Sequence, residues 1–562
     1  MEKGFDRRSF VAGGAAAGFL ALAGGALAAC TTDSPSKSEG NPTDTAQTAV
    51  DKASPIAAVA APSQWDKEAD IVVVGAGGGG LTAATRARQE GLSIIVVEKL
   101  NIVGGNTQSA TMFSVPGNTP DQDAREFAVP SYPFEPEKWA DFMINAHQQS
   151  GNPEMLKLIG SNVPELFTWV SDSWGIDNWT LAPAGSYYTV APLGMDEIIG
   201  KAYEVGQQLG AEFMLGTSAK ALVKDGDRVV GLQVTDETGK ELYLHGTKGV
   251  LLCGGGFASN KDLLAEYCPS ALTRAAACFL SSSDQGEPLR MALGAGAEVV
   301  HKDSFAIFDG GMDWEEFGGE WCHYLYDGAT QLVRQPWLLI DASGNRMRYI
   351  PTNKAGSLTD QAAIETATPG NRSYIIFDSK WDEYALPFEQ KACRTLIKDG
   401  VDRQPYVPEY YQDYHAGVQD AIDMGVIRKF DTIEELAESL DMDSTVLAAA
   451  VDKWNATCAT GEDDFMYPLD PSWLHPVSTP PYYGAKIGGN LFLTATGVAI
   501  NTKMQVLDTK SKPIPGLYAG WYTAAGAFAP STMVSMRYSP CGVTRSFLGG
   551  YLAVGTIAAE EM

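Results

Sequence analysis

The sequence has few of the residues that build metal and haem sites. Its eight cysteines include no CxxC pair, the spacing that zinc and iron–sulfur sites commonly use, and no CxxCH, which attaches c-type haem. The six histidines are scattered singly along the 562 residues. Nothing in this pattern points to a metal site. Without a haem of its own, the protein must receive any electrons from another molecule.

Basic residues are also scarce. The chain has 41 Lys and Arg against 69 Asp and Glu, and its formal net charge is −28. Because nucleic-acid binding depends on neutralising phosphates with Lys and Arg, we expect no nucleic-acid partner. The acidic charge has two interpretations, which are a solvated surface that favours solubility and attraction to a basic electron-transfer partner.

The N-terminus has the pattern of an export signal. The twin arginine Arg7-Arg8 precedes an apolar run, residues 11–29, that is rich in Ala and Gly. This pattern is typical of a twin-arginine signal, and an N-terminal membrane anchor is the alternative. The run ends in Leu27-Ala28-Ala29-Cys30, which resembles a bacterial lipobox. We therefore expect residues 1–30 to be a lipoprotein-type signal and Cys30 to hold the protein at the outer face of the membrane. Cleavage without lipidation, which would release the protein to the periplasm or the medium, is the alternative.

The composition changes after this signal. Residues 31–64 are rich in Ser, Thr, Pro, Asp and Ala without periodicity, so they are predicted to form a flexible linker. With 45% hydrophobic and 20% charged residues overall, the chain has the composition of a globular protein, and its length suggests two or three domains.

A glycine-rich turn predicts a dinucleotide site. Residues 69–74 are rich in β-branched residues, as in a buried strand, and lead into six residues with five glycines and then a helical segment. Gly75 permits a tight turn, Gly77 lets the backbone approach a pyrophosphate, and Gly80 allows close packing of helix on strand. The helix N-terminus then faces the phosphates. The expected cofactor contacts are Gly75, Gly77, Gly79 and Gly80.

Two features after this turn favour FAD. A second predicted strand, residues 93–97, ends at Glu98, whose carboxylate can accept hydrogen bonds from ribose hydroxyls. After Lys99 comes a second glycine pair, which again exposes backbone N–H groups to an anion. This segment resembles the GGNS/T motif that wraps the pyrophosphate and flavin in fumarate reductase-like flavoproteins. Its residues are Gly104, Gly105, Asn106 and Thr107.

Further landmarks of these flavoproteins follow in order along the chain. They are GVLLCGGGF at 249–257, which contains Gly255, YIIFD at 374–378, a helical pair within 431–458 and IPGLYAG at 514–520. On this resemblance the chain is identified as a member of the fumarate reductase and 3-ketosteroid dehydrogenase superfamily. The resemblance implies FAD as the cofactor, with Lys99 and Gly255 among its contacts.

The resemblance also implies an α/β fold. A Rossmann-like FAD-binding domain is expected to be split between residues 66–270 and 483–562, with an α+β cap domain inserted at 271–482. Alternation of apolar and polar residues between 219 and 248 predicts antiparallel strands within the FAD domain. The active site is expected where the two domains meet, and closure of the cap would exclude water from the flavin.

The reaction expected of this superfamily needs an anion site and an acid. Flavin N5 passes a hydride to an electron-poor carbon of a C=C bond while a side chain protonates the neighbouring carbon, and the reverse is dehydrogenation. The cap of fumarate reductases carries Thr-Glu-x-x-Arg, which TQLVR from Thr330 to Arg334 resembles with Glu replaced. Arg334 is therefore predicted to hold a substrate carboxylate, with a structural ion pair as the alternative. Lys354, eight residues past a hairpin arginine, stands at the family's proton donor, and its rivals are Arg348 and Tyr349.

A C-terminal segment supplies two further candidates by resemblance. Arg537 matches the arginine that binds the substrate carboxylate in fumarate reductases. Tyr538 and Gly542 resemble the Y-x-x-x-G-x-T turn of 3-ketosteroid Δ1-dehydrogenases, where the tyrosine hydroxyl and glycine N–H hold a developing enolate oxygen. Both roles fit one site, and a loop that only covers the flavin is the alternative.

The substrate is expected to differ from fumarate. One substrate histidine of fumarate reductases is replaced by Leu493, and the other, expected near Phe305, is missing. The cap segment 305–337 is instead dense in aromatic residues, most of them expected to pack, which suits an aromatic or alicyclic substrate.

These observations predict an exported reductase of an activated C=C bond in an enoate or enone. A separate membrane or cytochrome donor is expected to supply its electrons, as in anaerobic respiration. The alternatives are a 3-ketosteroid dehydrogenase-like enzyme that acts on a steroid, and a lipid-anchored flavoprotein that binds a ligand without turnover.

Overall fold

The computed structural model describes most of the chain from residue 53 onward. The described residues are 53–110, 113–115, 140–141, 143–145, 152–177, 180–182, 188–190, 195–278, 280–313, 329–350, 357–385, 396–398, 401–403, 414–525, 527 and 542–560. The predicted signal with Cys30, and the candidates Lys354, Arg537 and Tyr538, lie outside them. No helix in the described part of the chain combines the length and hydropathy needed to cross a membrane.

The first sheet carries the glycine turn. Its strands run in the order β1, β8, β9, β10, β2, β3 and β7, and β22 pairs with β10 while β21 pairs with β22. Strands β22, β10, β2, β3 and β7 are parallel neighbours, and β8, β9 and β10 form the predicted antiparallel strands. The bounds are β1 Val59–Ala60, β2 Lys67–Val74, β3 Ile94–Val97, β7 Glu212–Met214, β8 Ser218–Asp225, β9 Arg228–Thr235, β10 Glu241–Leu252, β21 Gln505–Leu507 and β22 Pro513–Ala519.

The predicted linker ends earlier than expected. Val59 and Ala60 of β1 pair in parallel with β8, and the Ser54 carbonyl accepts a hydrogen bond from Arg290 Nε at 2.7 Å. Residues 53–64, expected to be free, are therefore held on the folded body. The apolar Ile56 and Val59 within this stretch are partly buried, which its overall polar composition concealed.

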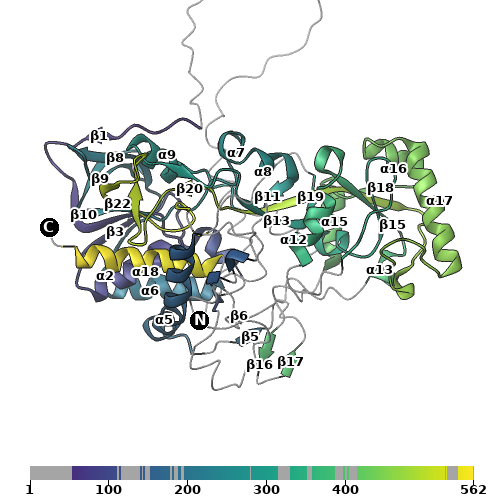
Figure 1. Ribbon diagram of the computed structural model, residues 1–562, viewed down its shortest axis with the longest axis horizontal. Helices are drawn as coiled ribbons and strands as arrows, with labels where there is room; N and C mark the ends of the chain where they lie inside the picture. The colour runs from purple at the N-terminus through teal and green to yellow at the C-terminus, as the bar shows by residue number, and fades with distance from the viewer. Residues whose placement is uncertain are drawn as a thin grey trace, which may run out of the picture. The chain divides into compact units, whose positions relative to one another are not determined.

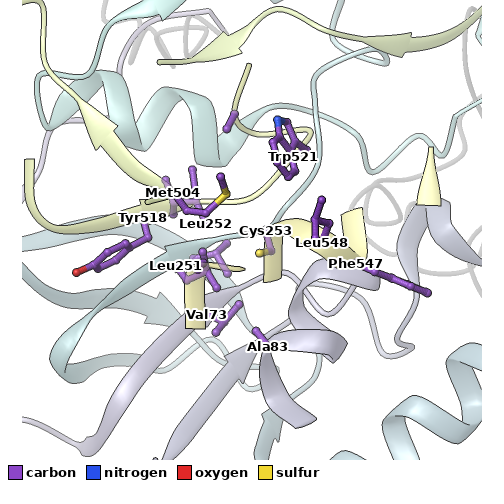
Figure 2. Close-up of a cluster of buried hydrophobic side chains, with 14 of the residues drawn as sticks. Val73, Ala83, Leu251, Leu252, Cys253, Met504, Tyr518, Trp521, Phe547 and Leu548 are labelled. Atoms are coloured by element: carbon purple, nitrogen blue, oxygen red, sulfur yellow. The ribbon is translucent and has the colours of Figure 1, made fainter. Parts of the chain in front are cut away.

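Helices cover the parallel strands and create a continuous core. Helix α2 (Gly78–Gln89) packs against α18 (Val543–Ala559), which also contacts β10 and β22 (Figure 1). Helices α5 (Pro153–Trp174) and α6 (Met195–Gln208) contact α18 and α2 respectively. Figure 2 shows Val73 and Leu251 of the strands and Leu548 of α18 in one cluster of buried side chains. Strands buried on both faces explain the unbroken apolar runs of β2 and β3.

A second sheet is built around the long strand β19 (Tyr482–Thr494). Strands β11, β13, β15 and β18 all pair with β19, and β14 pairs with β15. Their bounds are β11 Ala275–Cys278, β13 Phe305–Met312, β14 Leu338–Ile340, β15 Ser373–Asp378 and β18 Arg428–Phe430. Strands β11, β13, β14, β15 and β18 fall within the segment 271–482, whereas all of β19 after Tyr482 lies beyond it. The α/β fold class is therefore confirmed, and the domain boundaries stay a prediction.

Helices of the second sheet follow the sequence signals. The predicted helical pair is α16 (Ile433–Ser439) and α17 (Ser444–Thr460), which pack together. Thr432 Oγ1 accepts from Glu435 N at 3.2 Å, and Asp443 caps α17 by accepting from Thr445 N at 2.8 Å. Helix α12 (Ser357–Glu365) contacts β13 and β19, and α11 (Ala329–Val333) contacts β13.

Shorter elements connect these parts. They are η1 Gly105–Ser109, β4 Phe113–Ser114, β5 Thr180–Ala182, β6 Tyr188–Val190, α7 Lys261–Tyr267, α8 Pro269–Arg274, α9 Glu287–Gly294, β12 Val299–Val300, η2 Pro369–Asn371, α13 Trp381–Tyr384, β16 Leu396–Lys398, β17 Val401–Arg403, α15 Tyr414–Asp423, η4 Pro471–Trp473 and β20 Gly497–Val498.

Candidate active site

The turn after β2 has the geometry that its glycines predicted. Gly75 lies at φ 97°, a left-handed conformation that glycine favours, and its N–H donates to the Val97 carbonyl at 2.7 Å. A Cβ on Gly80 would lie 1.9 Å from the Gly75 carbonyl oxygen. The structure therefore confirms the tight turn at Gly75 and the close helix packing at Gly80.

The two glycine segments meet at the start of α2. Gly104 pairs with Gly77, and its N–H donates to the Ala76 carbonyl at 2.8 Å. Thr107 Oγ1 accepts from Gly78 N at 3.1 Å. On the other side, Ser546 Oγ of α18 accepts from Gly79 N at 3.1 Å. The segment 104–107 and the start of α18 thus enclose the helix N-terminus, where backbone N–H groups favour anions.

Glycine serves a different purpose at Gly77 and Gly105 than at Gly80. A Cβ on Gly77 would come no closer than 3.7 Å to other protein atoms, and one on Gly105 no closer than 4.0 Å. A Cβ would therefore make only ordinary van der Waals contact at these two positions. Crowding by the protein does not explain glycine there, whereas close approach of a pyrophosphate to the N–H groups would.

Glu98 is fixed beside this turn. Its Oε2 accepts from Ala76 N and its Oε1 from Leu100 N, both at 2.9 Å. The side chain is buried, and burial raises the pKa of the Glu98 carboxyl while the two N–H groups oppose that shift. Each carboxylate oxygen has further acceptor capacity, so the expected bonds to ribose hydroxyls remain compatible with this geometry.

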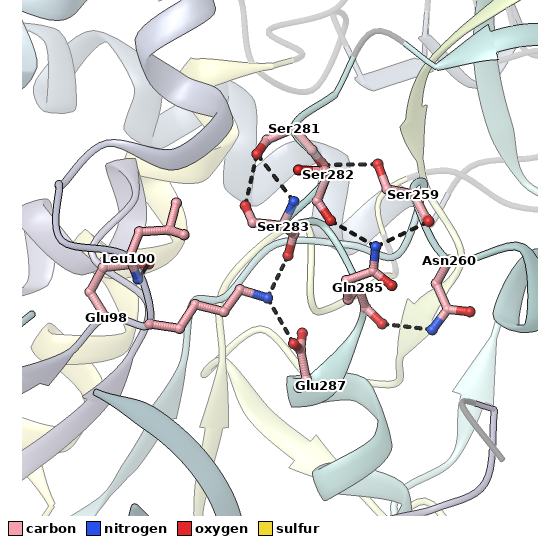
Figure 3. A network of polar contacts seen from close by, with 10 residues as sticks. Glu98, Leu100, Ser259, Asn260, Ser281, Ser282, Ser283, Gln285 and Glu287 are labelled. Carbon is pink, nitrogen blue, oxygen red and sulfur yellow. Dashed lines mark hydrogen bonds and ion pairs between the residues drawn. The ribbon is translucent and has the colours of Figure 1, made fainter. Parts of the chain in front are cut away.

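Lys99 and Asn106 both contact a loop that the sequence did not single out. Lys99 Nζ lies 2.7 Å from Glu287 Oε1 and 2.5 Å from the Ser283 carbonyl oxygen. Figure 3 labels Ser283 and Glu287 in this network of polar contacts. Asn106 Oδ1 accepts from Ser281 N at 2.8 Å. Lys99 is thus engaged in an ion pair within the protein, and its direct contact with a cofactor stays a prediction.

Asp284, in the same loop, lies against Gly255. Its Oδ2 accepts from Ala258 N at 3.1 Å, and a Cβ on Gly255 would lie 2.9 Å from its Oδ1. Burial raises the pKa of Asp284 to about 6. The run SSSDQG at 281–286 predicts a polar loop before a helix, but such loops are common and nothing in it marks a buried carboxyl.

The ends of three strands converge beside Gly255. The Gly255 carbonyl accepts from Thr523 Oγ1 at 2.9 Å, and Thr494 Oγ1 accepts from Phe257 N at 3.4 Å. Thr494 ends β19, and the residue before it is Leu493, which is buried and pairs with Ala306. An apolar, buried side chain therefore stands where the resemblance to fumarate reductases would place a substrate histidine.

Arg334 is already engaged within the second sheet. Its Nη2 lies 2.9 Å from Asp309 Oδ1 and donates to the Asp309 carbonyl at 3.0 Å. Arg334, Asp309 and the neighbouring Thr330 are buried. The structure thus shows the ion pair that was the alternative for Arg334. A bond from Arg334 to substrate, and a role for Thr330, stay predictions.

The remaining catalytic candidates are only partly described. Gly542 caps α18 at φ 67°, and its carbonyl accepts from Tyr522 OH at 3.0 Å. The rivals of Lys354 both have partners, since the Arg348 guanidinium lies 4.4 Å from the Tyr467 ring centroid and Tyr349 OH donates to the Arg334 carbonyl at 3.0 Å. Of the aromatic cap residues, Phe305, Phe308 and Trp337 are buried in packing.

Comparison with known proteins identifies the family. A model of the FAD binding domain family matches residues 70–542. The chain belongs to this family. It is an FAD-dependent oxidoreductase, and FAD is its cofactor.

Two of the similar proteins are named as reductases. This flavoprotein is 28% identical to urocanate reductase from Eggerthella lenta over 89% of this chain and 76% of that protein. It is 24% identical to vinyl phenol reductase from Lactiplantibacillus plantarum over 81% of this chain and 90% of that protein. A flavocytochrome c3 fumarate reductase in its open conformation has a TM-score of 0.63 at 22% identity, covering 88% of this chain and 79% of that one. This last similarity concerns the fold.

The residues around the turn fit FAD. A Cβ on Gly77 or Gly105 would not clash with other protein atoms, and Glu98 directly follows the neighbouring strand β3. The first turn of α2 contains no acidic side chain that would repel a pyrophosphate. We therefore assign these residues, with Asn106 and Thr107, as those that would hold FAD.

Proposed function

We propose that this flavoprotein reduces an activated C=C bond in an enoate or enone, with an aromatic or alicyclic substrate. The observation that carries the proposal is the apolar Leu493 at the end of β19, directly before Thr494, whose Oγ1 accepts a hydrogen bond from Phe257 N. A buried leucine does not bind the second carboxylate of a dicarboxylate substrate. The names of the relatives, urocanate reductase and vinyl phenol reductase, agree with an unsaturated substrate that carries a ring.

Bound FAD would supply the hydride, and the protein would do three things. Arg537 would hold the substrate carboxylate in a bidentate pair. Tyr538 OH and the Gly542 N–H would stabilise negative charge on the conjugated oxygen, and the positive φ of Gly542 supports a special backbone conformation there. Lys354 would protonate the carbon next to the one that receives hydride.

The place of this reaction is also part of the proposal. The twin-arginine pattern and Cys30 support export and attachment to the outer face of the membrane. Because the chain has no CxxCH, a separate cytochrome or quinol-linked protein would supply the electrons. Reduction of an external acceptor in this way would serve respiration.

The test uses the purified holoprotein with reduced viologen and a panel of acceptors. Cinnamates, small enoates, urocanate, vinyl phenols and steroid enones are offered in turn, and oxidation of viologen is followed. We expect turnover with a ring-bearing enoate or enone. Turnover with none of them, combined with oxidation of saturated ketosteroids by a dye acceptor, would replace the reductase with the dehydrogenase alternative. Turnover in neither direction would favour a ligand-binding flavoprotein.

Single substitutions test the residue roles. Lys354→Ala, Arg537→Ala and Tyr538→Phe are compared with Lys453→Ala, which changes an exposed lysine of α17. We expect each of the first three to lower kcat/KM by roughly 10²-fold, and Lys453→Ala to have no effect. Unchanged turnover in all three variants would refute the site assignment even if the reaction is correct.

A further inference from the structure

Residues 54–61, which include β1, form a strap that lies on the folded body. Strand β1 pairs in parallel with β8, and Ala61 N donates to the Lys224 carbonyl at 3.1 Å. Ile56 N donates to the Arg290 carbonyl at 2.9 Å. None of the strap residues is fully buried. Because a segment with few buried contacts opens at low cost, the strap can detach while the core stays folded.

Helix α9 forms the other half of this docking site. It lies beside β8 (Figure 1), and its Arg290 Nε donates to the Ser54 carbonyl at 2.7 Å. A Cβ on Gly294, the last residue of α9, would lie 1.7 Å from the Ile56 carbonyl oxygen. The atom in the way belongs to the backbone of the strap and cannot rotate aside. The strap therefore docks only because position 294 is glycine.

The opposite end of α9 packs against the cofactor turn. Its first residue, Glu287, pairs with Lys99 at 2.7 Å. A Cβ on Gly254 would lie 2.4 Å from Pro288 Cγ, and a Cβ on Gly75 would lie 2.8 Å from Gly254 Cα. Helix α9 thus rests on Gly254, which in turn rests on the glycine turn after β2.

The loop before α9 contacts two more segments assigned to the cofactor. Ser281 N donates to Asn106 Oδ1 at 2.8 Å. Asp284 Oδ2 accepts from Ala258 N at 3.1 Å, and a Cβ on Gly255 would lie 2.9 Å from Asp284 Oδ1. A shift of α9 and its loop must therefore disturb the surroundings of FAD at several places.

We propose that the strap is a latch for FAD, so that docking of residues 54–61 on α9 and binding of FAD stabilise each other. The strap contacts α9 at Arg290 and Gly294, and the cofactor segments contact it at Glu287 and Pro288. Two events that favour the same position of one element are coupled, and the coupling is reciprocal. The inference concerns the cofactor and does not depend on which substrate the enzyme reduces.

The first experiment measures FAD affinity with the strap displaced. Full-length apoprotein of wild type, Gly294→Ala and Gly200→Ala is titrated with FAD, and flavin fluorescence is followed. Gly200 is an exposed glycine of α6 where an added Cβ meets nothing within 4 Å, so it is the matched control. We expect the Kd for FAD to rise roughly fivefold or more in Gly294→Ala and to stay unchanged in Gly200→Ala. A wild-type Kd in Gly294→Ala would overturn the proposal.

The second experiment measures the same coupling from the strap. Hydrogen exchange of the Ile56 and Ala61 amides, both hydrogen-bonded, is followed by mass spectrometry with and without saturating FAD. In wild type, FAD should slow this exchange by the factor by which displacement of the strap weakens FAD binding, because the coupling is reciprocal. In Gly294→Ala the two amides should exchange fast in both states. Strap exchange in wild type that does not respond to FAD contradicts the latch.

A third variant separates the latch from a local defect in α9. Ile56→Pro removes the N–H that donates to the Arg290 carbonyl and leaves the sequence of α9 unchanged. We expect it to weaken FAD binding as much as Gly294→Ala, and the double variant to add no further loss, since both changes undo one contact. If Ile56→Pro binds FAD like wild type, the strap is not coupled to the cofactor and the proposal is wrong. This variant also decides the question if Gly294→Ala does not fold.

Discussion

At the scale of single residues, Glu98 joins the first two parallel strands to the glycine turn. Its two oxygens accept from Ala76 N and Leu100 N. Glu98→Gln keeps the volume, but one of these N–H groups would face the amide NH₂ and lose its acceptor. A buried donor without a partner costs about 1–3 kcal/mol, so we expect FAD to bind roughly tenfold or more weakly. Titration of apoprotein with FAD, followed by flavin fluorescence, measures this affinity.

The control for this substitution lies on β2. Glu68→Gln alters an exposed carboxylate that pairs with His245 at 2.8 Å, at the opposite end of β2 from the turn. An exposed pair contributes little, and FAD affinity should not change. Equal loss of affinity in both variants would show that the effect of Glu98→Gln is not specific to the turn.

Asp284 predicts a pH dependence of stability. Its folded-state pKa of about 6 is above the ordinary value of 3.8 because the group is buried. The folded protein therefore binds this proton more tightly than the unfolded chain, and stability from this group is lost as pH rises from about 4 to about 6. Compared with Asp284→Asn, wild type should lose about 3 kcal/mol of unfolding free energy over this interval and nothing further above it.

Urea unfolding of both proteins between about pH 4 and pH 7 measures this difference. Only the change with pH matters, because the asparagine amide alters the contact with Ala258 N by a constant amount. A difference between the two proteins that stays the same across this range would contradict a buried, protonatable Asp284.

The residues that could be predicted share one property. Gly75, Gly80 and Glu98 lie within one strand–turn–helix–strand unit, where spacing along the chain fixes position in space. Ser546 and Thr494 reach the same site from more than 200 residues away, as their hydrogen bonds to Gly79 and Phe257 show. Single hydroxyl residues at that separation carry no local pattern, so only the folded structure brings them into the site.

At the scale of elements, the packing of α18 on α2 depends on glycine. A Cβ on Gly550 would lie 2.0 Å from the Gly79 carbonyl oxygen, whereas a Cβ on Gly555 of the same helix would meet nothing within 4 Å. Gly550→Ala must push α18 away from the helix that begins at the cofactor turn. We expect it to lower the free energy of unfolding by about 1–3 kcal/mol and to weaken FAD retention.

Gly555→Ala provides the opposite case in the same helix. Alanine is the better helix former and finds free space there, so this variant should be more stable than wild type by about 0.5–1 kcal/mol. Urea unfolding and the flavin-to-protein absorbance ratio distinguish the two variants. A similar destabilisation by both would mean that the effect of alanine on stability comes from helix formation in α18 and not from close packing on Gly79.

Elements were predictable where a periodic or capping signal was strong. The antiparallel strands between 219 and 248, and α16 and α17 with their Thr432 and Asp443 caps, follow the sequence. Strand β19 continues past residue 483, where the FAD domain was expected to resume, because its residues pair with β13 and β15 along its length. Such pairing is decided by partners distant in sequence, which local propensity does not reveal.

At the scale of the whole molecule, the net charge of −28 has two interpretations, which are solubility and attraction to a basic electron donor. The salt dependence of flavin reduction distinguishes them. If the charge attracts a basic electron donor, it should also attract a small cationic reductant and repel an anionic one. Salt weakens both effects, because dissolved ions at 0.1 M screen the interaction between charges more than about 10 Å apart. The rates of flavin reduction by two reductants of opposite charge should therefore respond to salt in opposite directions.

Stopped-flow reduction of the oxidised holoprotein measures these rates. Between about 10 mM and 0.2 M salt, the second-order rate constant for the viologen radical cation should fall roughly tenfold, and that for the sulfur dioxide radical anion from dithionite should rise. Neutral sucrose at matched viscosity is the control for diffusion. If salt changes neither rate constant, the negative charge lies away from the route to the flavin and serves solubility. Opposite slopes would instead indicate that a natural donor approaches this protein with a basic surface.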